Sequence, residues 1–141
     1  MILLDTNVLS ALMRDPPDPA VVRWLDQQPA ESIWTTSITV FEVRMGLALL
    51  PDDRRQRTLQ ALFEQLLAED LQHRVLDFDS AAAAQATELA ARRQRAGRPV
   101  DMRDTQIAGI ALARHAAVAT RNVRHFGDLD VPVIDPWQQA V

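Results

Sequence analysis

The sequence predicts an α/β protein, in which helices wrap a short and mostly parallel central sheet. Short apolar runs alternate along the chain with longer segments of helical periodicity, and the connections between them are brief. The 141 residues are 48% hydrophobic and 24% charged, which is the balance of an ordinary globular domain. We therefore expect a single domain over residues 1–141, without a linker or a repeat.

The N-terminal half predicts two strands and four helices. Ile2, Leu3 and Leu4 form an apolar run typical of a strand that is buried on both faces. Pro19 suits the first turn of a helix whose N-cap would be Asp18. The other elements expected here are helices over 8–14, 19–28, 37–50 and 52–70 and a strand over 32–35. The last two helices flank a Pro-Asp-Asp turn and predict an αα-hairpin over residues 37–70.

The C-terminal half continues the alternation and closes the sheet. Asp79 or Ser80 suits the N-cap of a long Ala-rich helix, and Gly97 suits its end because glycine readily adopts left-handed backbone angles. The elements expected here are strands over 74–78, 117–120 and 131–134 and helices over 80–97 and 101–115.

Residue types that the chain lacks exclude several kinds of chemistry. Because it has no Cys, disulfides, thiolate metal ligands and a Cys nucleophile are excluded. Its 15 basic residues are all Arg, which excludes a Walker P-loop and a Schiff-base lysine. His73, His115 and His125 lack the spacing of a zinc protease. Carboxylates remain abundant, and the net charge of −4 argues against a surface built for broad nucleic-acid binding.

The sequence also predicts a cytoplasmic protein without a membrane partner. No apolar stretch approaches the length of a membrane span, and the chain enters its first strand without a basic leader. The absence of Cys fits a reducing compartment.

Asp5 stands where chemistry is favoured in a parallel sheet. It directly follows the first apolar run, and ligands of open α/β sheets bind beyond the carboxyl ends of the strands. Alternatively, Asp5 or Thr6 caps the helix that follows. The residue alone leaves both interpretations open.

Glu42 is the second candidate, because its helical neighbours are largely apolar. Residues three and four positions away on a helix share a face, and here they are Ile38, Thr39, Met45 and Gly46. A carboxylate on such a face points toward the interior or a cleft, where a buried charge needs a partner. An ion pair with Arg44 is the structural alternative, but Arg44 lies nearly opposite on the helix.

Asp104 and Asn122 complete the set of candidates. Asp104 lies on a largely apolar helical line, although it also suits the third position of a helix that Asp101 caps. Asn122 follows the predicted strand over 117–120 and would lie near Asp5 if the two strands pair. Its alternative is a turn residue, since Asn readily bonds its own backbone.

Together these segments resemble the PIN domain family, and most of all its bacterial toxin branch, the VapC and FitB-like toxins of type II toxin–antitoxin modules. The resemblance covers essentially the whole chain. It rests on Asp5-Thr6-Asn7, Glu42, residues 99–108, Ala119-Thr-Arg-Asn122 and the closing Val133-Ile-Asp-Pro-Trp137, which is similar to the Asn-Pro-Trp ending of FitB-like members.

The resemblance implies an endoribonuclease toxin that depends on Mg²⁺ or Mn²⁺ and hydrolyses RNA phosphodiester bonds. Asp5, Glu42 and Asp104 would be its catalytic carboxylates and metal ligands, and Asn122 its fourth catalytic residue, at a position that is often acidic. Some members carry another acid at the position of His125. One or two metal ions are therefore both open, and Asp128 is a candidate replacement.

The resemblance also implies partners. These are a small antitoxin encoded alongside, whose tail fills a groove of the toxin, an RNA such as tRNA or rRNA, and a second copy of the chain in a homodimer. Arg side chains pair well with phosphate, so the candidate RNA guides are Arg92, Arg93, Arg95, Arg98, Arg103, Arg121 and Arg124. For residues 92–98 a solvated helix face is the alternative.

Two other functions remain open at this point. A phosphotransfer enzyme could use Asp5 as its nucleophile, but the families that do so also use a Lys, which this chain lacks. A PIN domain that binds RNA or protein without cleavage is the stronger alternative, because Asn122 replaces an acid. Three inward carboxylates argue against it, since buried charges without a purpose are costly.

Overall fold

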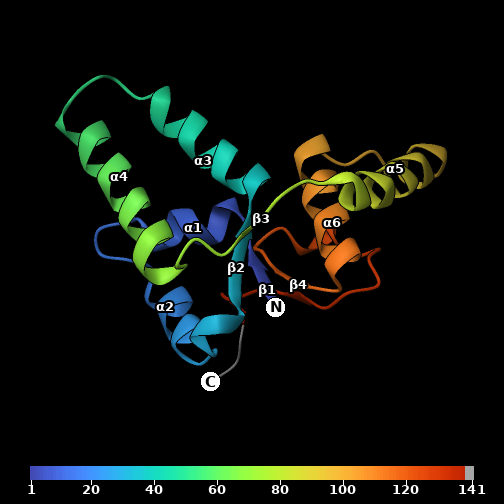
Figure 1. The fold of residues 1–141 in the computed structure, drawn as a ribbon, viewed down its shortest axis with the longest axis horizontal. Helices are drawn as coiled ribbons and strands as arrows, with labels where there is room; N and C mark the ends of the chain where they lie inside the picture. The colour runs from blue at the N-terminus through green and yellow to red at the C-terminus, as the bar shows by residue number, and fades with distance from the viewer. Residues whose placement is uncertain (139–141) are drawn as a thin grey trace.

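Five parallel strands form the centre of the computed structural model, which describes residues 1–138 (Figure 1). In chain order they are β1 (Ile2–Leu4), β2 (Ile33–Thr36), β3 (Val75–Leu76), β4 (Ala117–Ala119) and β5 (Val133–Ile134). Their order in the sheet is β3-β2-β1-β4-β5. The predicted α/β class is confirmed, and the sheet is wholly rather than mostly parallel.

The strand order creates a topological switch point between β1 and β4, where the direction in which successive strands are added to the sheet reverses. The chain builds β1, β2 and β3 in one direction and then returns to place β4 and β5 on the other side of β1. Leu3 pairs with Trp34 of β2 on one side and with Val118 of β4 on the other. In such sheets the crevice beyond the carboxyl ends of the two central strands is the usual ligand site.

Six helices surround the sheet. They are α1 (Thr6–Leu12), α2 (Pro19–Asp26), α3 (Ser37–Ala48), α4 (Arg54–Gln65), α5 (Ser80–Arg95) and α6 (Met102–Arg114). Helices α3 and α4 form the predicted αα-hairpin, and the α5–α6 pair lies across the sheet from it (Figure 1). None of the helices in residues 1–138 has the length and apolar character needed to cross a membrane.

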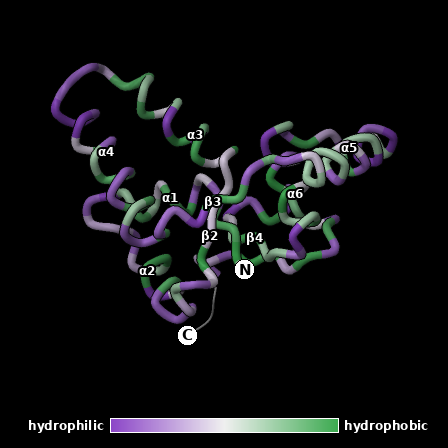
Figure 2. The backbone as a smooth tube through the Cα atoms, viewed as in Figure 1, coloured by the Kyte–Doolittle hydropathy of each residue, from purple (hydrophilic) through white to green (hydrophobic). Residues whose placement is uncertain are grey.

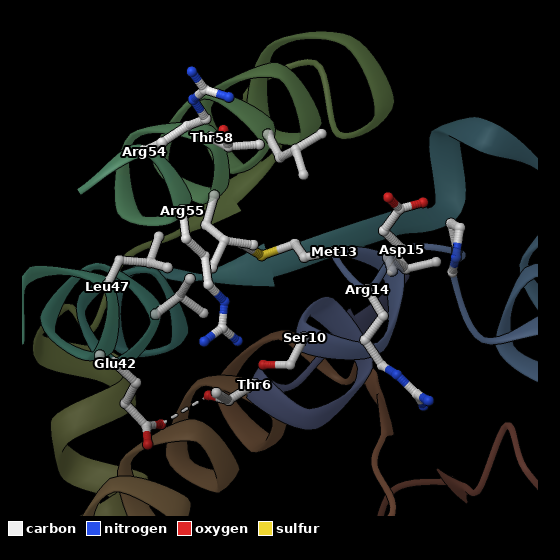
Figure 3. Close-up of a pocket in the computed structure, with 16 residues that line it drawn as sticks. Thr6, Ser10, Met13, Arg14, Asp15, Glu42, Leu47, Arg54, Arg55 and Thr58 are labelled. Atoms are coloured by element: carbon white, nitrogen blue, oxygen red, sulfur yellow. Dashed lines mark hydrogen bonds between the residues drawn. The ribbon is translucent and has the colours of Figure 1, made fainter. Parts of the chain in front are cut away.

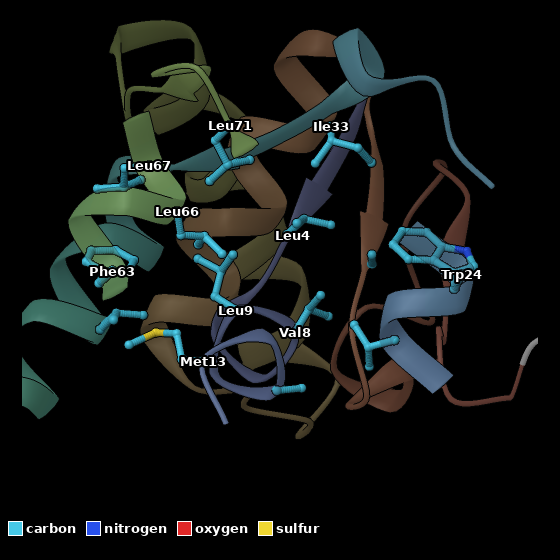
Figure 4. Packing of buried hydrophobic residues seen from close by; sticks show 14 of the residues in the cluster. Leu4, Val8, Leu9, Met13, Trp24, Ile33, Phe63, Leu66, Leu67 and Leu71 are labelled. Carbon is cyan, nitrogen blue, oxygen red and sulfur yellow. The ribbon is translucent and has the colours of Figure 1, made fainter. Parts of the chain in front are cut away.

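Neighbouring residues of each strand supply two separate cores, because side chains alternate between the faces of a sheet. Leu4 and Ala119 join a cluster with residues of α1 to α4, part of which Figure 4 shows. Leu3 and Val118 join a second cluster with residues of α5 and α6. Hydrophilic segments lie at the periphery, notably the turn between α3 and α4 (Figure 2).

The predicted elements are all present, and their ends differ where local chemistry decides them. Helix α1 starts two residues earlier than predicted, directly after its N-cap Asp5. The helix predicted over 52–70 becomes α4 followed by a π-helical turn, η2 (Leu66–Asp70). Asp79 rather than Ser80 caps α5, and Gly97 has the expected positive φ of 66°. The last residues of the domain predicted over 1–141 lie outside the described residues.

Candidate active site

Asp5 lies at the switch point and connects β1 to β4. Its backbone N–H donates to the carbonyl of Ala119 at 3.1 Å. Its Oδ2 accepts a hydrogen bond from Oγ1 of Thr120 at 2.5 Å, and its Oδ1 accepts one from the backbone N–H of Val8 at 3.3 Å. One carboxylate therefore caps α1, as the structural alternative predicts, and also lines the cleft beyond the strands, while its chemical role stays a prediction.

Burial changes the acidity of Asp5. The side chain is almost fully buried, and this burial raises the pKa of Asp5 from the usual 3.8 to about 6. The hydrogen bonds from Thr120 and Val8 oppose the rise, while the charge of Asp104 adds to it. A carboxyl group in this state gains from a nearby cation, which would favour its ionised form.

Glu42 reaches the same cleft from α3. Thr36 starts this helix as N-cap, accepting a hydrogen bond from the backbone N–H of Thr39. Oε1 of Glu42 accepts a hydrogen bond from Oγ1 of Thr6 at 3.2 Å (Figure 3), and Oε2 lies 3.4 Å from Nη1 of Arg103. Burial raises the pKa of Glu42 as well, although both of these partners oppose the rise.

The expected inward orientation of Glu42 is confirmed, and so is the opposite orientation of Arg44. The Glu42 side chain is only 21% exposed. Arg44 turns instead to the α4 side of the hairpin, where its Nη2 lies 3.0 Å from Oε1 of Glu64.

Asp104 lies in the first turn of α6 and faces His125. Asp101 is the N-cap of this helix, accepting a hydrogen bond from the backbone N–H of Arg103 at 2.9 Å. Oδ2 of Asp104 lies 2.5 Å from Nδ1 of His125, which belongs to the short turn η3 (Val123–His125). Asp104 thus takes the third position of the helix that Asp101 caps, as the structural alternative predicts, and it also lines the cleft.

All four predicted residues line one cleft of about 320 Å³. Asn122 lies at its exposed rim, and its backbone N–H donates to Oγ1 of Thr120 at 3.0 Å. The side-chain amide of Asn122 makes no hydrogen bond within residues 1–138. The lining residues are Asp5, Thr6, Asn7, Glu42, Asp101, Arg103, Asp104, Ile107, Asn122 and His125.

Asp128 and Arg93, which the sequence suggested as a metal ligand and an RNA guide, do not line the cleft. Asp128 does not line the cleft, because its two carboxylate oxygens accept hydrogen bonds from Arg93 at 3.0 and 2.7 Å. The expectation that Arg93 guides RNA is wrong, since its side chain is only 4% exposed and its hydrogen bonds hold it inside. Conversely, His125 belongs to the cleft, as does Arg103 through its ion pair with Glu42.

The chemistry of the cleft fits a hard divalent cation. Asp5, Glu42 and Asp104 offer oxygen donors, which Mg²⁺ and Mn²⁺ prefer. The charge of Asp104 raises the pKa of Asp5 and of Glu42, and the charge of Asp101 also raises the pKa of Glu42, so negative charges lie close together in the cleft. In residues 1–138 no three such side chains converge closely enough to hold a metal ion. Each of the three carboxylates contacts a protein group instead, namely Thr120, Arg103 or His125. Ion binding would replace some of these partners.

Residues 2–131 match the PIN domain. The chain belongs to the PIN domain family. The predicted family is therefore confirmed, while the catalytic roles of Asp5, Glu42, Asp104 and Asn122 stay a prediction.

Relatives in this family match nearly the full chain. Plasmid stability protein StbB of Pseudomonas syringae pv. tomato is 41% identical over 138 residues, which cover 98% of this chain and 99% of that protein. VapC ribonuclease Y4jK of Sinorhizobium fredii is 38% identical over 140 residues, covering 99% and 100%. The tRNA(fMet)-specific endonuclease VapC of Shigella flexneri is 31% identical over 124 residues, covering 88% of both.

A solved structure of FitAB bound to a DNA fragment has the same PIN fold. One of its chains superposes with a TM-score of 0.89 at 35% sequence identity, covering 100% of this chain and 99% of the other.

Proposed function

We propose that this PIN domain is an endoribonuclease toxin of a toxin–antitoxin pair and cleaves RNA in the cleft of Asp5, Glu42 and Asp104. One observation carries the proposal: three carboxylates from distant parts of the chain meet in a single cleft at the switch point of the sheet. The relatives named ribonuclease and tRNA(fMet)-specific endonuclease support RNA, and tRNA in particular, as the substrate.

The three carboxylates would hold Mg²⁺ or Mn²⁺, directly or through water. When bound, such an ion neutralises phosphate charge and activates water for attack on phosphorus. The chain's own residues orient the carboxylates: the hydroxyl of Thr120 holds Asp5, and that of Thr6 holds Glu42. The free side-chain amide of Asn122 would hydrogen-bond the RNA phosphate or an ordered water at the rim.

The electrostatics of the cleft support an absolute need for the cation. The lining carries four carboxylates, those of Asp5, Glu42, Asp101 and Asp104, and among residues 1–138 its basic side chains are Arg103 and His125. A phosphodiester entering this cleft alone would meet like charges at short range in a partly desolvated site, which is unfavourable. We therefore expect chelation to abolish cleavage.

Cleavage of a mixed tRNA and rRNA pool by the purified protein tests the proposal. We expect discrete fragments with Mg²⁺ or Mn²⁺ and none with EDTA. Glu42→Gln and Asp104→Asn should each lower kcat/KM by at least about 100-fold, because losing several kcal/mol of charge stabilisation costs about tenfold per 1.4 kcal/mol. Asp26→Asn, an exposed change on α2, is the matched control and should leave cleavage unchanged.

A large groove beside the cleft supports a protein partner. It encloses about 1270 Å³ between α1 and the α3–α4 hairpin, and it shares Thr6 and Glu42 with the cleft (Figure 3). Apolar side chains such as Leu47 and Leu59 line it together with Arg54 and Arg55 from α4. We propose that a segment of the antitoxin with apolar and acidic side chains fills this groove, in line with the FitAB complex.

Changes in the groove test the partner separately from the chemistry. Leu62→Glu alters an exposed apolar residue of the groove lining and should reduce co-purification with the small protein encoded beside this chain. Cleavage of RNA by the isolated variant should stay at the level of the wild type, because Leu62 does not line the carboxylate cleft.

A binding module without catalysis is the second candidate, favoured by the amide of Asn122 at the rim. If the protein binds RNA but does not cleave it in the presence of Mg²⁺ or Mn²⁺, the result would support the binding module. The homodimer and the cytoplasmic location expected from the sequence stay predictions.

A further inference from the structure

A positively charged cavity lies beside the loop that carries His125. It encloses about 440 Å³ between the segment that follows α5 and the turn that follows β4. The residues that line it are Arg93, Arg98, Val100, Arg124, Gly127 and Asp128.

The charges of this cavity do not cancel. Its one acid in the described lining, Asp128, accepts both of its short hydrogen bonds from Arg93, and Arg93 holds the pKa of Asp128 below its ordinary value. Arg98 and Arg124 are exposed and make no ion pair within residues 1–138. Two guanidinium groups are thus available to an anion, and guanidinium forks bind phosphate in two-pronged fashion.

The cavity is tied to the carboxylate cleft by consecutive residues. His125 lines the cleft and Arg124 lines the cavity, and neighbouring Cα atoms are only about 3.8 Å apart. Arg93 fixes this junction, because its Nη2 donates to the carbonyl of His125 at 2.6 Å and its Nη1 to Oγ1 of Thr105 at 3.0 Å. The same turn therefore borders an acidic site and a basic one.

We propose that this cavity binds a backbone phosphate of the RNA strand next to the phosphate that is cleaved. This proposal rests on the proposed endoribonuclease function and assigns the binding of the RNA backbone to this cavity. A protein with a net charge of −4 offers RNA little general attraction, so this binding requires a local basic site. Phosphate contacts of this kind position the strand and carry no sequence preference.

The test compares two double variants that remove the same charge. Arg98→Ala with Arg124→Ala alters the cavity, and Arg23→Ala with Arg57→Ala alters exposed residues of α2 and α4 that line neither site. Binding of a short single-stranded RNA of mixed sequence is measured by fluorescence anisotropy in EDTA over a series of KCl concentrations. Matching thermal melts verify that both variants fold.

We expect the cavity variant to bind RNA about tenfold more weakly, because it loses charge-assisted hydrogen bonds to phosphate. The slope of log Kd against log salt should fall by about 1, because each phosphate contact releases counterions. In cleavage assays KM should rise while kcat is retained. Replacing both residues with Lys should preserve the salt slope, which a merely structural role of the guanidinium groups would not predict.

Affinity and salt slope equal to those of the control variant would overturn the phosphate site, whether or not the wild type cleaves RNA. The failure of the proposed function is a separate result. If the wild type cleaves nothing with either metal but the cavity variant still binds RNA more weakly than the control, the phosphate site stands and the nuclease proposal falls.

Discussion

At the scale of single residues, Asp5 combines two requirements that usually belong to different side chains. Its carboxylate caps α1 through Val8 and faces the cleft while bonded to Thr120. Because the group is almost fully buried, ionisation is disfavoured, and the pKa of Asp5 rises to about 6. The carboxyl group of Asp5 therefore loses its proton about two pH units later than an exposed aspartate does.

The first prediction concerns stability against pH in the presence of EDTA. The unfolded chain loses the Asp5 proton near its usual pKa of 3.8, whereas the folded protein keeps it up to about 6. The contribution of Asp5 to the free energy of unfolding should therefore fall by about 3 kcal/mol as the pH rises through this window. Urea unfolding between pH 4 and 7 measures it, and Asp5→Asn should remove this decline. If the free energy of unfolding falls equally with pH in the wild type and in Asp5→Asn, the prediction is contradicted.

The second prediction concerns the buried guanidinium of Arg93. Arg93→Met removes the hydrogen bonds that Asp128, the His125 carbonyl and the Thr105 hydroxyl accept from the guanidinium, which should lower the free energy of unfolding by about 2 kcal/mol. Arg92→Met, an exposed change on the same helix, should lower it by less than about 0.5 kcal/mol. Equal urea midpoints for the two variants would count against a structural role of Arg93.

Sequence reasoning found the carboxylates of the site but not their partners. Glu42 and Asp104 stood out because their helical neighbours are apolar, a local property of the sequence. The contact of Asp104 with His125 and the burial of Arg93 depend on a loop that folds back across α5 and α6. Such long-range contacts leave no periodic signal, so Arg93 resembled its exposed neighbours.

At the scale of elements, a close contact of α5 and α6 sets the position of Asp104. Gly109 permits this contact, because a Cβ atom there would lie 2.5 Å from the carbonyl oxygen of Ala82 and 2.7 Å from Cβ of Ala86. Both neighbours are parts of helix α5 that cannot turn away as a flexible side chain would. The helix that carries Asp104 is therefore seated by a residue without a side chain.

The third prediction compares two glycines inside helices. Gly109→Ala should lower the free energy of unfolding by about 2 kcal/mol, since overpacking forces the two helices apart. Gly46→Ala on α3 has open space around the new methyl group and should raise it by about 0.5–1 kcal/mol. Thermal unfolding measures both, and the prediction fails if the two changes have the same sign.

Sequence periodicity predicts the six α-helices and five strands described in residues 1–138, and it fails mainly at their ends and at the short 3-10 turns. The strand predicted over 74–78 contracts to Val75–Leu76, because only two residues pair with β2. The π-helical turn at Leu66–Asp70 was predicted as ordinary helix, since one extra residue in a turn barely alters the apolar pattern. Capping residues, in contrast, were predicted well, because their hydrogen bonds are local.

At the scale of the whole molecule, the proposed binding of a metal ion in the acidic cleft would couple to global stability. A ligand that binds only the folded protein raises its stability by mass action. Asp5 follows β1, Glu42 lies in the middle of α3 and Asp104 lies in the first turn of α6, so the unfolded chain does not bring the three carboxylates together.

The fourth prediction follows from this coupling. Mn²⁺ at about 100 times its Kd should stabilise the wild type by about 2.7 kcal/mol, seen as a rise in Tm. Glu42→Gln combined with Asp104→Asn should abolish the rise, while KCl of equal ionic strength serves as the control. An equal rise in Tm for the double variant would show that Mn²⁺ binds elsewhere.

The order of synthesis determines when the cleft at the switch point can form. Asp5 and its partner Thr120 are 115 positions apart, and residues are added at roughly 5–20 per second. A nascent chain that ends before β4 has neither the Ala119 carbonyl that receives the N–H of Asp5 nor the cleft rim at Asn122. The proposed nuclease would thus lack a complete cleft until β4 and Asn122 have been synthesised and β4 has paired with the N-terminal strand.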